Sequence, residues 1–596
     1  MEEITKAVLE AGGQQAAERA VAAMPSPSGV PASLHASLMA RLDRLGSAKE
    51  VAQIGAAIGR EFSHTLLASV VRQSETELQF ALDHLIAAGL LFRQGVPPHA
   101  TYLFKHALVQ DAAYGTLLRE PRRALHARIA AALEREFADI SEVQPELLAR
   151  HCTEAGEIEK AADLWSKAGQ RSLERSALIE AAEKLARALS LLATLPGTPE
   201  LRREQIKLQV ALITPLMQVK GHAAPETIAA AEKAQLLIEQ AEAIGEPSGD
   251  PLLLFSVLYG FWAASHAAFK GDVMCALAAQ FLGLAEKQKT IVPIMVGHRL
   301  MGSSLTLTGD IAEGRAHYDQ AIALHDPDAH GSLTTRFGQD IGVSNLAFRS
   351  LALFLVGYPA SARRDNDEAV KRARQIGHGS TLILGLVYTT LLGLLSRDFR
   401  ATSSAVDEME VLVEETGALF WRVIAKLSRG GALALNDQSS KAVPILSANL
   451  ATYRSTGTKM WVPFWLVNLA RAQAAIIQFD AAWHSIADAI ETLQATGERW
   501  IEAWVYQTAG EIALMESTPD FVKAQNYLMR AIVTAQAQQS KTWELRAAMS
   551  LARLWRDQGK VQQAREMLAP VYGWFTEGFD TRDLKEAKAL LEESGS

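Results

Sequence analysis

The fold is decided by the stretch from Leu300 to Pro327, which reads LMGSSLTLTGDIAEGRAHYDQAIALHDP. Gly309 divides this stretch into two helix-forming halves, because glycine adopts the left-handed conformation that ends a helix at little cost. Gly314 and Ala321 are seven residues apart in the second half, so they lie on one helix face two turns apart. Small side chains on one face let two helices approach closely. The stretch therefore predicts a pair of packed helices closed by a proline.

The same spacing recurs along the chain. A glycine is followed five residues later by a small residue and seven residues after that by another, or one half of this pattern is present. These offsets resemble the small positions of tetratricopeptide repeats, although the full consensus is not met. We therefore expect an array of helix pairs with degenerate copies. The copies are Gly156 with Ala161 and Ala168, Gly271 with Ala276 and Gly283, Gly309 with Gly314 and Ala321, Gly357 with Ala362 and Ala369, Gly559 with Ala564, and Ala524 with Ala531.

A second period runs through the C-terminal half. The segments TGALFW, TGTKMW, TGERW and QSKTW end at Trp421, Trp461, Trp500 and Trp543, about 40 residues apart. The tryptophans either converge on a ligand or wedge between successive helix pairs. Equal spacing favours the wedge, because it places each tryptophan at an equivalent position in its own repeat.

Composition and charge exclude several classes of protein. The 596 residues are 49% hydrophobic and 21% charged, which is ordinary for folded domains, and the formal net charge of -8 disfavours extensive contact with nucleic acid. The two cysteines, Cys152 and Cys275, are far apart and fit a reducing compartment. The N-terminal residues MEEITKAVLEAGG lack the basic and apolar segments of an export signal.

Two charge-free stretches approach the length of a membrane span: Pro251 to Phe269 and Ser380 to Ser396. Each is followed by a polar amphipathic segment that can pair with it. We interpret both as buried helices of the array and expect no membrane contact.

The region before the repeats combines helices with a hairpin. Ser74 and Glu77 form a predicted capping box that starts a helix through Ala88. The segments LLFR (90–93) and TYLF (101–104) then read as two short strands. Helices followed by a hairpin are typical of a winged helix. The candidate recognition helix contains Glu75, Glu77 and Asp83 but no lysine or arginine, so protein contact is favoured over DNA contact.

Two runs in this region, VPASLHASLMARLDRLGSAKEVAQIGAAIGREFS and TYLFKHALVQDAAYGTLL, resemble large bacterial adenylate/guanylate cyclase-type regulators. Those proteins join a class III cyclase, a STAND-type (signal-transduction) P-loop ATPase, a winged helix and a tetratricopeptide array. The resemblance covers residues 1–200 best and implies a sensory or regulatory role. MEEITKAVLE resembles the last helix of the ATPase module. The chain has no G-x-x-x-x-G-K-[ST] loop, so no catalytic residue of the family can be assigned to it.

No catalytic, cofactor-binding or metal-binding residue is predicted. The motifs of serine hydrolases, zinc proteases, dinucleotide-binding loops and calcium loops are absent from the sequence. The nearest metal-like run is HDPDAH, with His325, Asp326, Asp328 and His330, and we interpret it as a solvated turn. His151 and Cys152 are adjacent on a helix and point apart, so Cys152 is expected to be a buried thiol.

Two further groups of polar residues follow the predicted hairpin. The first is expected to be a structural hydrogen-bond cluster in which His106 is a possible pH switch, and it comprises Lys105, His106, Asp111 and Tyr114. The second is expected to be a solvated basic helix face, with an acidic partner surface as the alternative, and it comprises Arg119, Arg122, Arg123 and Arg128.

The sequence thus predicts an all-α fold: a right-handed α-solenoid of tetratricopeptide-like helix pairs behind a small winged-helix-like module with one short β-hairpin. Residues 1–24 are assigned to a terminal helix of an absent ATPase module, 25–120 to the winged-helix-like domain, 121–200 to the first repeats and 201–596 to the main array.

The function expected from this reading is that of a non-catalytic regulatory or adaptor scaffold in the cytoplasm, binding a protein or peptide in its concave groove without a cofactor. An ATPase or cyclase module encoded upstream is a second expected partner. The alternatives are a fragment or split partner of an ATP-dependent adenylate cyclase-type regulator and a winged-helix transcriptional regulator.

Overall fold

A computed structural model of the chain describes residues 32–246, 250, 252–326 and 338–593. The predicted helix within residues 1–24 lies outside this range. The chain divides into two compact units. Unit 1 comprises Met1–Ala168 and Ser190–Leu195, and unit 2 comprises Gly169–Leu189 and Pro196–Ser596.

Unit 1 begins with helices that flank a small sheet and continues as helices alone. Its elements are α3 (Ala32–Asp43), α4 (Ser47–Ile58), β1 (Glu61–Ser63), α5 (His64–Val70), α6 (Glu75–Ala87), β2 (Leu91–Gln94), β3 (Thr101–Phe104), α7 (Ala107–Gly115), α8 (Arg119–Glu136), α9 (Ala138–Val143) and α10 (Pro145–Ala155). Two helices contain residues of both units, α11 (Ile158–Glu174) and α12 (Leu178–Leu192).

The sheet of unit 1 has three antiparallel strands in the order β1-β3-β2. Strands β2 and β3 form the predicted hairpin, with Leu91 opposite Phe104. Strand β1 was not predicted, because three residues are too few to show an alternating pattern. The capping box of α6 is confirmed: Ser74 Oγ accepts from the Glu77 amide at 3.4 Å, and Glu77 Oε2 accepts from the Ser74 amide at 2.8 Å.

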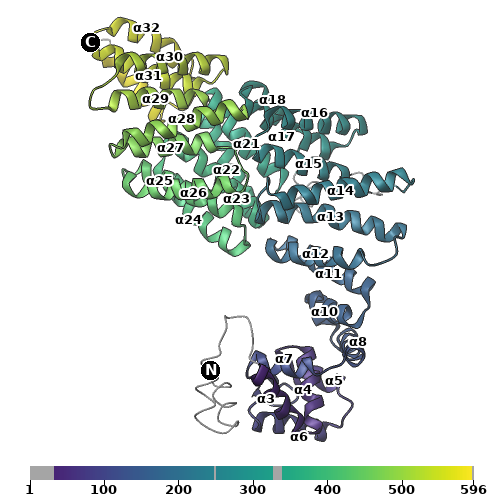
Figure 1. The fold of residues 1–596 in the computed structure, drawn as a ribbon. Helices are drawn as coiled ribbons and strands as arrows, with labels where there is room; N and C mark the ends of the chain where they lie inside the picture. The colour runs from purple at the N-terminus through teal and green to yellow at the C-terminus, as the bar shows by residue number, and fades with distance from the viewer. Residues whose placement is uncertain (1–31, 247–249, 251, 327–337, 594–596) are drawn as a thin grey trace, which may run out of the picture. The chain divides into compact units, whose positions relative to one another are not determined.

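Unit 2 is a tetratricopeptide-like array of consecutive helix pairs, coloured from blue to yellow in Figure 1. In each pair an inner helix is followed by an outer helix. The pairs are α13 (Pro199–Val219) with α14 (Pro225–Ala243), α15 (Leu252–Ala267) with α16 (Gly271–Gln288), α17 (Ile291–Thr308) with α18 (Ile311–Ala323), α21 (Ile341–Val356) with α22 (Pro359–Ile376), α23 (Gly379–Ser396) with α24 (Phe399–Thr416), α25 (Leu419–Leu435) with α26 (Ser439–Ser455), α27 (Val462–Ala475) with α28 (Phe479–Thr496), α29 (Glu502–Met515) with α30 (Phe521–Ala537), and α31 (Lys541–Asp557) with α32 (Val561–Gly573), followed by α33 (Arg582–Glu593).

The clearest copy of the repeat behaves as its sequence predicts up to Asp326, while Pro327, expected to close the pair, lies outside the described residues. Gly309 adopts φ +109° between α17 and α18, and Gly314 and Ala321 are buried on the face of α18 toward α17. A Cβ on Gly314 would lie 2.8 Å from the carbonyl oxygen of Gly302 in α17. Glycine is therefore required where these two backbones meet.

One predicted copy is wrong by two residues. Gly271 begins α16 instead of ending α15, and Ala276 and Gly283 are exposed. The turn is made by Phe269 at φ +46°, and the residues five and twelve positions later, Met274 and Phe281, are fully buried. The offsets hold, but a non-glycine residue occupies the left-handed position.

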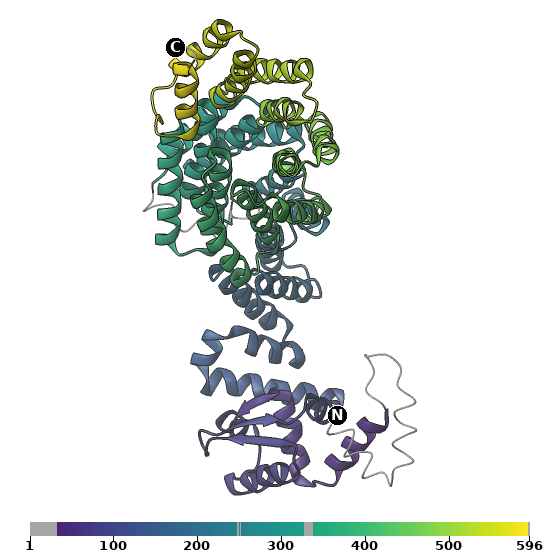
Figure 2. The same cartoon turned by 90° about the vertical axis from the view of Figure 1, so that its left-hand side faces the viewer.

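The second half of unit 2 packs directly on the first half. Backbone carbonyls at the ends of α15 and α17 accept hydrogen bonds from the segments that precede α27 and α29: Met460 N to Ala267 O at 3.0 Å and Arg499 N to Leu307 O at 2.8 Å. The hydroxyl of Ser540 donates to Leu355 O at 2.9 Å across 185 residues. These bonds place one turn of the coil on the previous turn, as the teal and green helices in Figure 2 show.

The four periodic tryptophans are buried at this junction, each in its own layer. The Trp421 indole donates to the side-chain oxygen of Gln218, and the Trp543 indole donates to Trp500 O at 2.9 Å. Trp461 packs edge-on to Tyr388 at a centroid distance of 6.0 Å. The tryptophans therefore serve packing and do not converge on one ligand.

The two charge-free stretches form helices α15 and α23, which are buried among their neighbours. Among the described residues, α23 is the one helix long and apolar enough to cross a membrane, and 78% of it is buried inside the protein. Both helices belong to a continuous apolar core that extends from Leu178 to Trp543.

Candidate binding sites in the helical array

The inner face of unit 2 is mostly protein core. Helices α21, α23 and α27 are buried along nearly their whole length, because the two turns of the coil pack on each other. A peptide laid along these helices would displace packed side chains. The concave groove predicted from the sequence is therefore closed over this part of the array.

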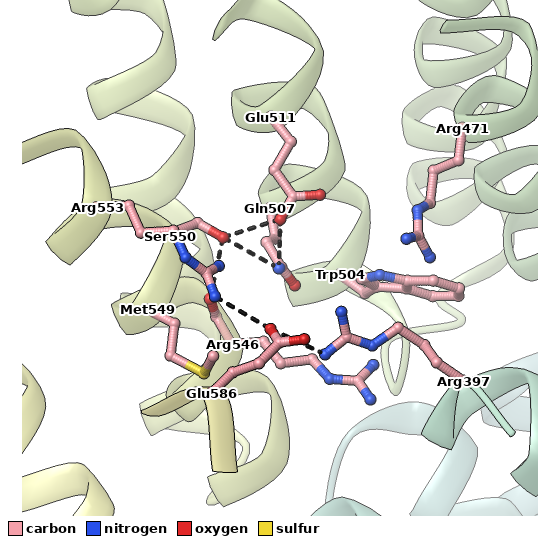
Figure 3. A pocket seen from close by; sticks show the side chains of 10 residues that line it. All are labelled: Arg397, Arg471, Trp504, Gln507, Glu511, Arg546, Met549, Ser550, Arg553 and Glu586. Carbon is pink, nitrogen blue, oxygen red and sulfur yellow. Dashed lines mark hydrogen bonds and ion pairs between the residues drawn. The ribbon is translucent and has the colours of Figure 1, made fainter. Parts of the chain in front are cut away.

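A small charged cavity remains among the inner helices, and we call it the arginine recess (Figure 3). Its volume is about 40 Å³. Helices α27, α29, α31 and α33 and the end of α23 contribute its lining, which comprises Arg397, Arg471, Trp504, Gln507, Glu511, Arg546, Met549, Ser550, Arg553 and Glu586.

Helical spacing explains why these side chains gather. Arg546, Ser550 and Arg553 follow one another at intervals of four and three residues, which places them on one face of α31. Arg397 ends α23 in the left-handed conformation, with φ +60°. Glu586 is on the last helix of the described chain, three residues after Asp583.

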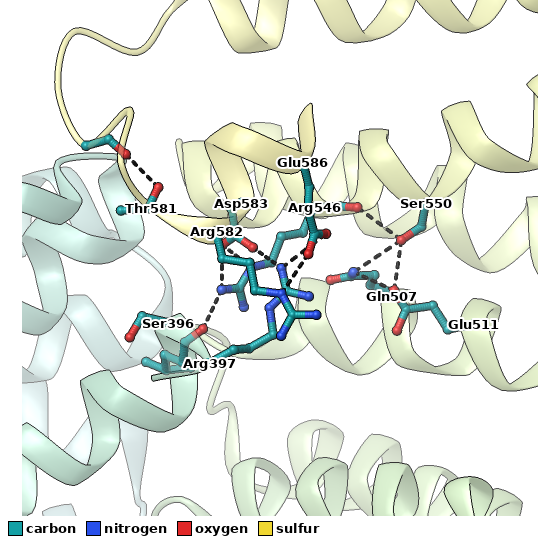
Figure 4. Close-up of polar contacts among 12 residues, drawn as sticks. Ser396, Arg397, Gln507, Glu511, Arg546, Ser550, Thr581, Arg582, Asp583 and Glu586 are labelled. Atoms are coloured by element: carbon teal, nitrogen blue, oxygen red, sulfur yellow. Dashed lines mark hydrogen bonds and ion pairs between the residues drawn. The ribbon is translucent and has the colours of Figure 1, made fainter. Parts of the chain in front are cut away.

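Three of the arginines are held by two carboxylates of α33 (Figures 3 and 4). Arg546 contacts Asp583 at 2.6 Å, and Arg397 contacts the other oxygen of the same carboxylate. Arg553 lies 3.0 Å from Glu586. Burial by itself would raise the pKa of Asp583, but Arg546 and Arg397 outweigh burial and lower it, so this carboxylate stays ionised.

Arg471 is different, because none of the described carboxylates forms an ion pair with it. Its guanidinium carbon lies 5.6 Å from the centroid of the Trp504 ring, and it points toward Arg397 in Figure 3. Burial is the main cause that lowers the pKa of Arg471; Glu511 opposes this change, while the charges of Arg397 and Arg546 add to it. A guanidinium without a carboxylate partner is suited to binding an oxyanion.

A second hollow lies on the outer side of the array, partly between α28 and α30 and partly over α30 alone, and we call it the outer groove. Tyr527 joins its two parts, of about 280 and 460 Å³. Trp483 lines one part, and Val522 lines the other. The ammonium group of Lys523 lies 3.4 Å from the centroid of the Trp483 ring and fixes the ring against the rim.

Large apolar side chains continue from the outer groove along α30. Val522, Met529 and Val533 share one face of this helix, and Val522 and Val533 are 73% and 61% exposed. Phe521, at the start of the helix, is also exposed. A cluster of this kind is unusual on a free surface and is typical of a surface that contacts protein.

The HDPDAH run, interpreted from the sequence as a solvated turn, is only partly described. Asp328 and His330 lie outside the described residues. The ring of His325 lies against Gly342 at the start of α21, where a Cβ would clash with it. Among residues 32–246, 250, 252–326 and 338–593, no group of three or more histidine, cysteine, aspartate or glutamate side chains is arranged to hold a metal.

His151 and Cys152 are both buried, as expected for structural residues, and burial raises the pKa of Cys152 to about 12. His151 lies in a chain of hydrogen bonds that the sequence did not reveal. Its Nδ1 is 2.8 Å from Nδ1 of His126, whose Nε2 is 2.9 Å from the Tyr114 hydroxyl. Burial lowers the pKa of His126 to about 4 and that of His151 to about 3, so both rings are neutral near pH 7.

The predicted basic face of α8 is only partly solvated. Arg119 is exposed, but Arg123 donates to the carbonyl oxygen of Ala155 at 2.7 Å. Arg122 donates to Leu117 O at 3.0 Å and stacks on Tyr114. Two of the four arginines therefore close neighbouring helix ends.

The remaining members of the predicted polar groups are placed separately. Lys105 has its ammonium group 5.6 Å from the centroid of the Phe92 ring, and Asp111 is exposed. Arg128 is half-buried, and burial, followed by repulsion from Arg72, lowers its pKa. A switch role for His106 stays a prediction.

Sequence reasoning missed the arginine recess. A signal was present, because Arg471 interrupts the apolar helix VPFWLVNLARAQAA and Arg546 interrupts a buried face of α31. A charge in such a position needs a partner or a ligand. The partner of Arg397 is Asp583, 186 residues away, and no local pattern identifies it.

Comparison with known proteins identifies relatives by sequence and by structure. No family model matches the chain. An uncharacterized protein of Rhizobium meliloti (strain 1021) is 29% identical over 336 residues, which cover 56% of this chain and 32% of that protein. The match thus spans about a third of the length of this curated relative.

Among solved structures, yeast Tom70 is similar at 12% identity over 79% of this chain and 96% of that chain, with a TM-score of 0.34. A Signal Transduction ATPase with Numerous Domains protein with a tetratricopeptide repeat sensor, from Pyrococcus horikoshii, is similar at 11% identity over 96% of this chain and 67% of that chain, with a TM-score of 0.28.

Proposed function

We propose that the chain is a non-catalytic regulatory or adaptor scaffold that binds a protein partner at the outer groove. The observation that carries this proposal is the exposed apolar face of α30 beside a groove lined by Trp483 and Tyr527. Aromatic side chains with one open face are the usual anchors of protein interfaces. The partner presents an amphipathic helix whose apolar side chains enter the groove.

The packing of the array suits this role. The two turns of unit 2 share one core, so α28 and α30 are held by a rigid support. Trp483 is fixed from two sides, because its indole donates to Glu516 at 2.6 Å while Lys523 covers its ring. A surface organised before binding loses less conformational entropy when the partner docks.

A cytoplasmic location and a place in a cyclase- or STAND-type signalling system belong to the same proposal. Unit 1 would then act as a winged-helix-like module for contacts with protein. Its helix α6 supports this use over DNA binding, since Glu75, Glu77 and Asp83 are exposed and Arg93 neutralises only Asp83, at 3.2 Å.

The test compares two valine variants of the full chain. V522D places a charge in the outer groove, and V411D makes the same change at another exposed valine, on α24. Proteins captured specifically from cell extract are identified and the interaction is remade from purified components. We expect V522D to weaken binding at least tenfold and V411D to leave it unchanged, with both variants folded by circular dichroism.

Equal binding by wild type and V522D would contradict the outer groove as the docking surface. ATP binding or cyclic nucleotide synthesis by the purified chain would contradict the non-catalytic role and favour the cyclase-type alternative.

A further inference from the structure

The arginine recess holds more positive than negative charge. Arg397, Arg471, Arg546 and Arg553 line it together with Glu511 and Glu586, and Asp583, beside the recess, pairs with Arg397 and Arg546. Four cations thus face three carboxylates in a partly buried space. Excess charge of one sign is costly where water is scarce, unless a counter-ion joins it.

The carboxylates in the recess are already engaged. Glu586 contacts Arg553 at 3.0 Å and Arg582 at 2.7 Å. Glu511 accepts from the Ser550 hydroxyl at 2.8 Å and from the Gln507 amide at 2.9 Å. These contacts leave no carboxylate of the recess paired with Arg471.

Two donors point to the position of the missing anion. The guanidinium of Arg471 enters the recess above the Trp504 ring and has no hydrogen bond to any described residue. The Nε of Arg397 is buried on the same recess and also lacks an acceptor among the described residues. Arg471 is half-buried, whereas the Arg397 Nε is fully buried. Buried donors without acceptors are rare, so the Arg397 Nε beside the unpaired Arg471 indicates an unfilled site.

We propose that the arginine recess binds a phosphate group. The excess of positive charge favours an anion, and arginine presents paired donors to the oxygens of a phosphate. The volume of about 40 Å³ holds roughly three water-sized groups, so it excludes a peptide and would take only part of a phosphate's oxygens, the rest facing the opening. The phosphate is free or ends a small molecule whose remainder projects outward.

A bound phosphate would connect distant parts of unit 2. Arg397 ends α23, Arg471 is on α27 and Arg546 is on α31, so one anion would attract three inner helices at once. The site is independent of the outer groove, which is formed by α28 and α30.

The experiment measures thermal unfolding of the full chain with inorganic phosphate, glycerol phosphate or acetate, at matched ionic strength. We expect inorganic phosphate to raise the melting temperature and to give saturable binding by calorimetry. Glycerol phosphate distinguishes a phosphate ester from the free ion. Acetate, a monoanion, is expected to bind at least tenfold more weakly.

The variant R471Q tests the assignment. It removes the unpaired charge, so we expect it to melt above wild type without phosphate and to bind phosphate at least tenfold more weakly. The control R530Q removes an arginine of the outer groove whose guanidinium carbon lies 4.1 Å from the centroid of the Tyr506 ring. This variant should retain phosphate binding. Phosphate binding that is absent in wild type, equal in R471Q or matched by acetate would overturn the proposal.

Discussion

Glu498 is a single residue on which the junction between the two turns depends. It is fully buried, and its carboxylate accepts from the Trp500 indole at 2.7 Å and from the Trp461 amide at 3.2 Å. Burial raises the pKa of Glu498 to about 8, and the two hydrogen bonds only partly oppose this change. The folded chain therefore retains a proton that the unfolded chain releases at acidic pH.

This raised pKa predicts a pH dependence of stability. Below the unfolded pKa of 4.5 both states are protonated; as pH rises from 4.5 toward 8, only the unfolded state ionises, and it gains stability relative to the folded state. We expect the free energy of unfolding, measured with urea, to fall by on the order of a few kcal/mol more in wild type than in E498Q as pH rises across this window. Parallel stability curves for the two proteins would contradict a protonated Glu498.

Two glycines show how local space decides the effect of the same substitution. In G314A the new methyl group meets the backbone of Gly302 at 2.8 Å, so we expect a loss of about 1–3 kcal/mol. In G283A nothing lies within 4 Å of the new methyl group, and helix propensity favours alanine by about 1 kcal/mol. Chemical denaturation should therefore show a lower free energy of unfolding for G314A and a higher one for G283A. Destabilisation by both variants would contradict the close contact of α17 with α18.

At the scale of the elements, the sequence reveals a helix turn only where glycine makes it. The turns at Gly309 and Gly357 were predicted, whereas those made by Phe269, Arg397 and Ile477 were not. These non-glycine residues adopt positive φ because the paired helices fix both ends of the turn. The buried face five and twelve residues later is present in each case, but its side chains include threonine, methionine and phenylalanine.

The turn at Ile477 gives a prediction for one element. A β-branched residue at φ +64° costs roughly 1–2 kcal/mol, and Ile477 recovers little by packing because it is 78% exposed. We expect I477G to raise the free energy of unfolding by about 0.5–1 kcal/mol after the entropy of glycine is subtracted. The control A475G, two residues earlier in α27, should lose about 1 kcal/mol. A lower free energy of unfolding in I477G than in wild type would show that the turn is unstrained.

For the whole molecule, the sequence predicted the helix pairs but not how they coil. Local spacing identifies which helices are neighbours in sequence, whereas contacts between turns, such as those of Ser540, Thr542 and Trp421, join residues 185 to 203 positions apart. Those contacts convert the inner face into core and bring Arg397 to Asp583. The arginine recess therefore exists only after the chain has coiled, which is why no motif predicted it.

The same coiling predicts that unit 2 does not unfold one repeat at a time. In an open solenoid each repeat contacts only its neighbours, and a defect stays local. Here Trp500 is fully buried, and its amide donates to Leu307 O in α17 at 3.3 Å. We therefore expect W500A to lower the free energy of unfolding by about 3–5 kcal/mol and to speed hydrogen exchange in α17. L568A removes a buried side chain from the separate C-terminal cluster and should leave exchange in α17 unchanged. If exchange in W500A rises only in α27, α28 and α29, the two turns are energetically independent despite their contact, and the array responds as an ordinary solenoid.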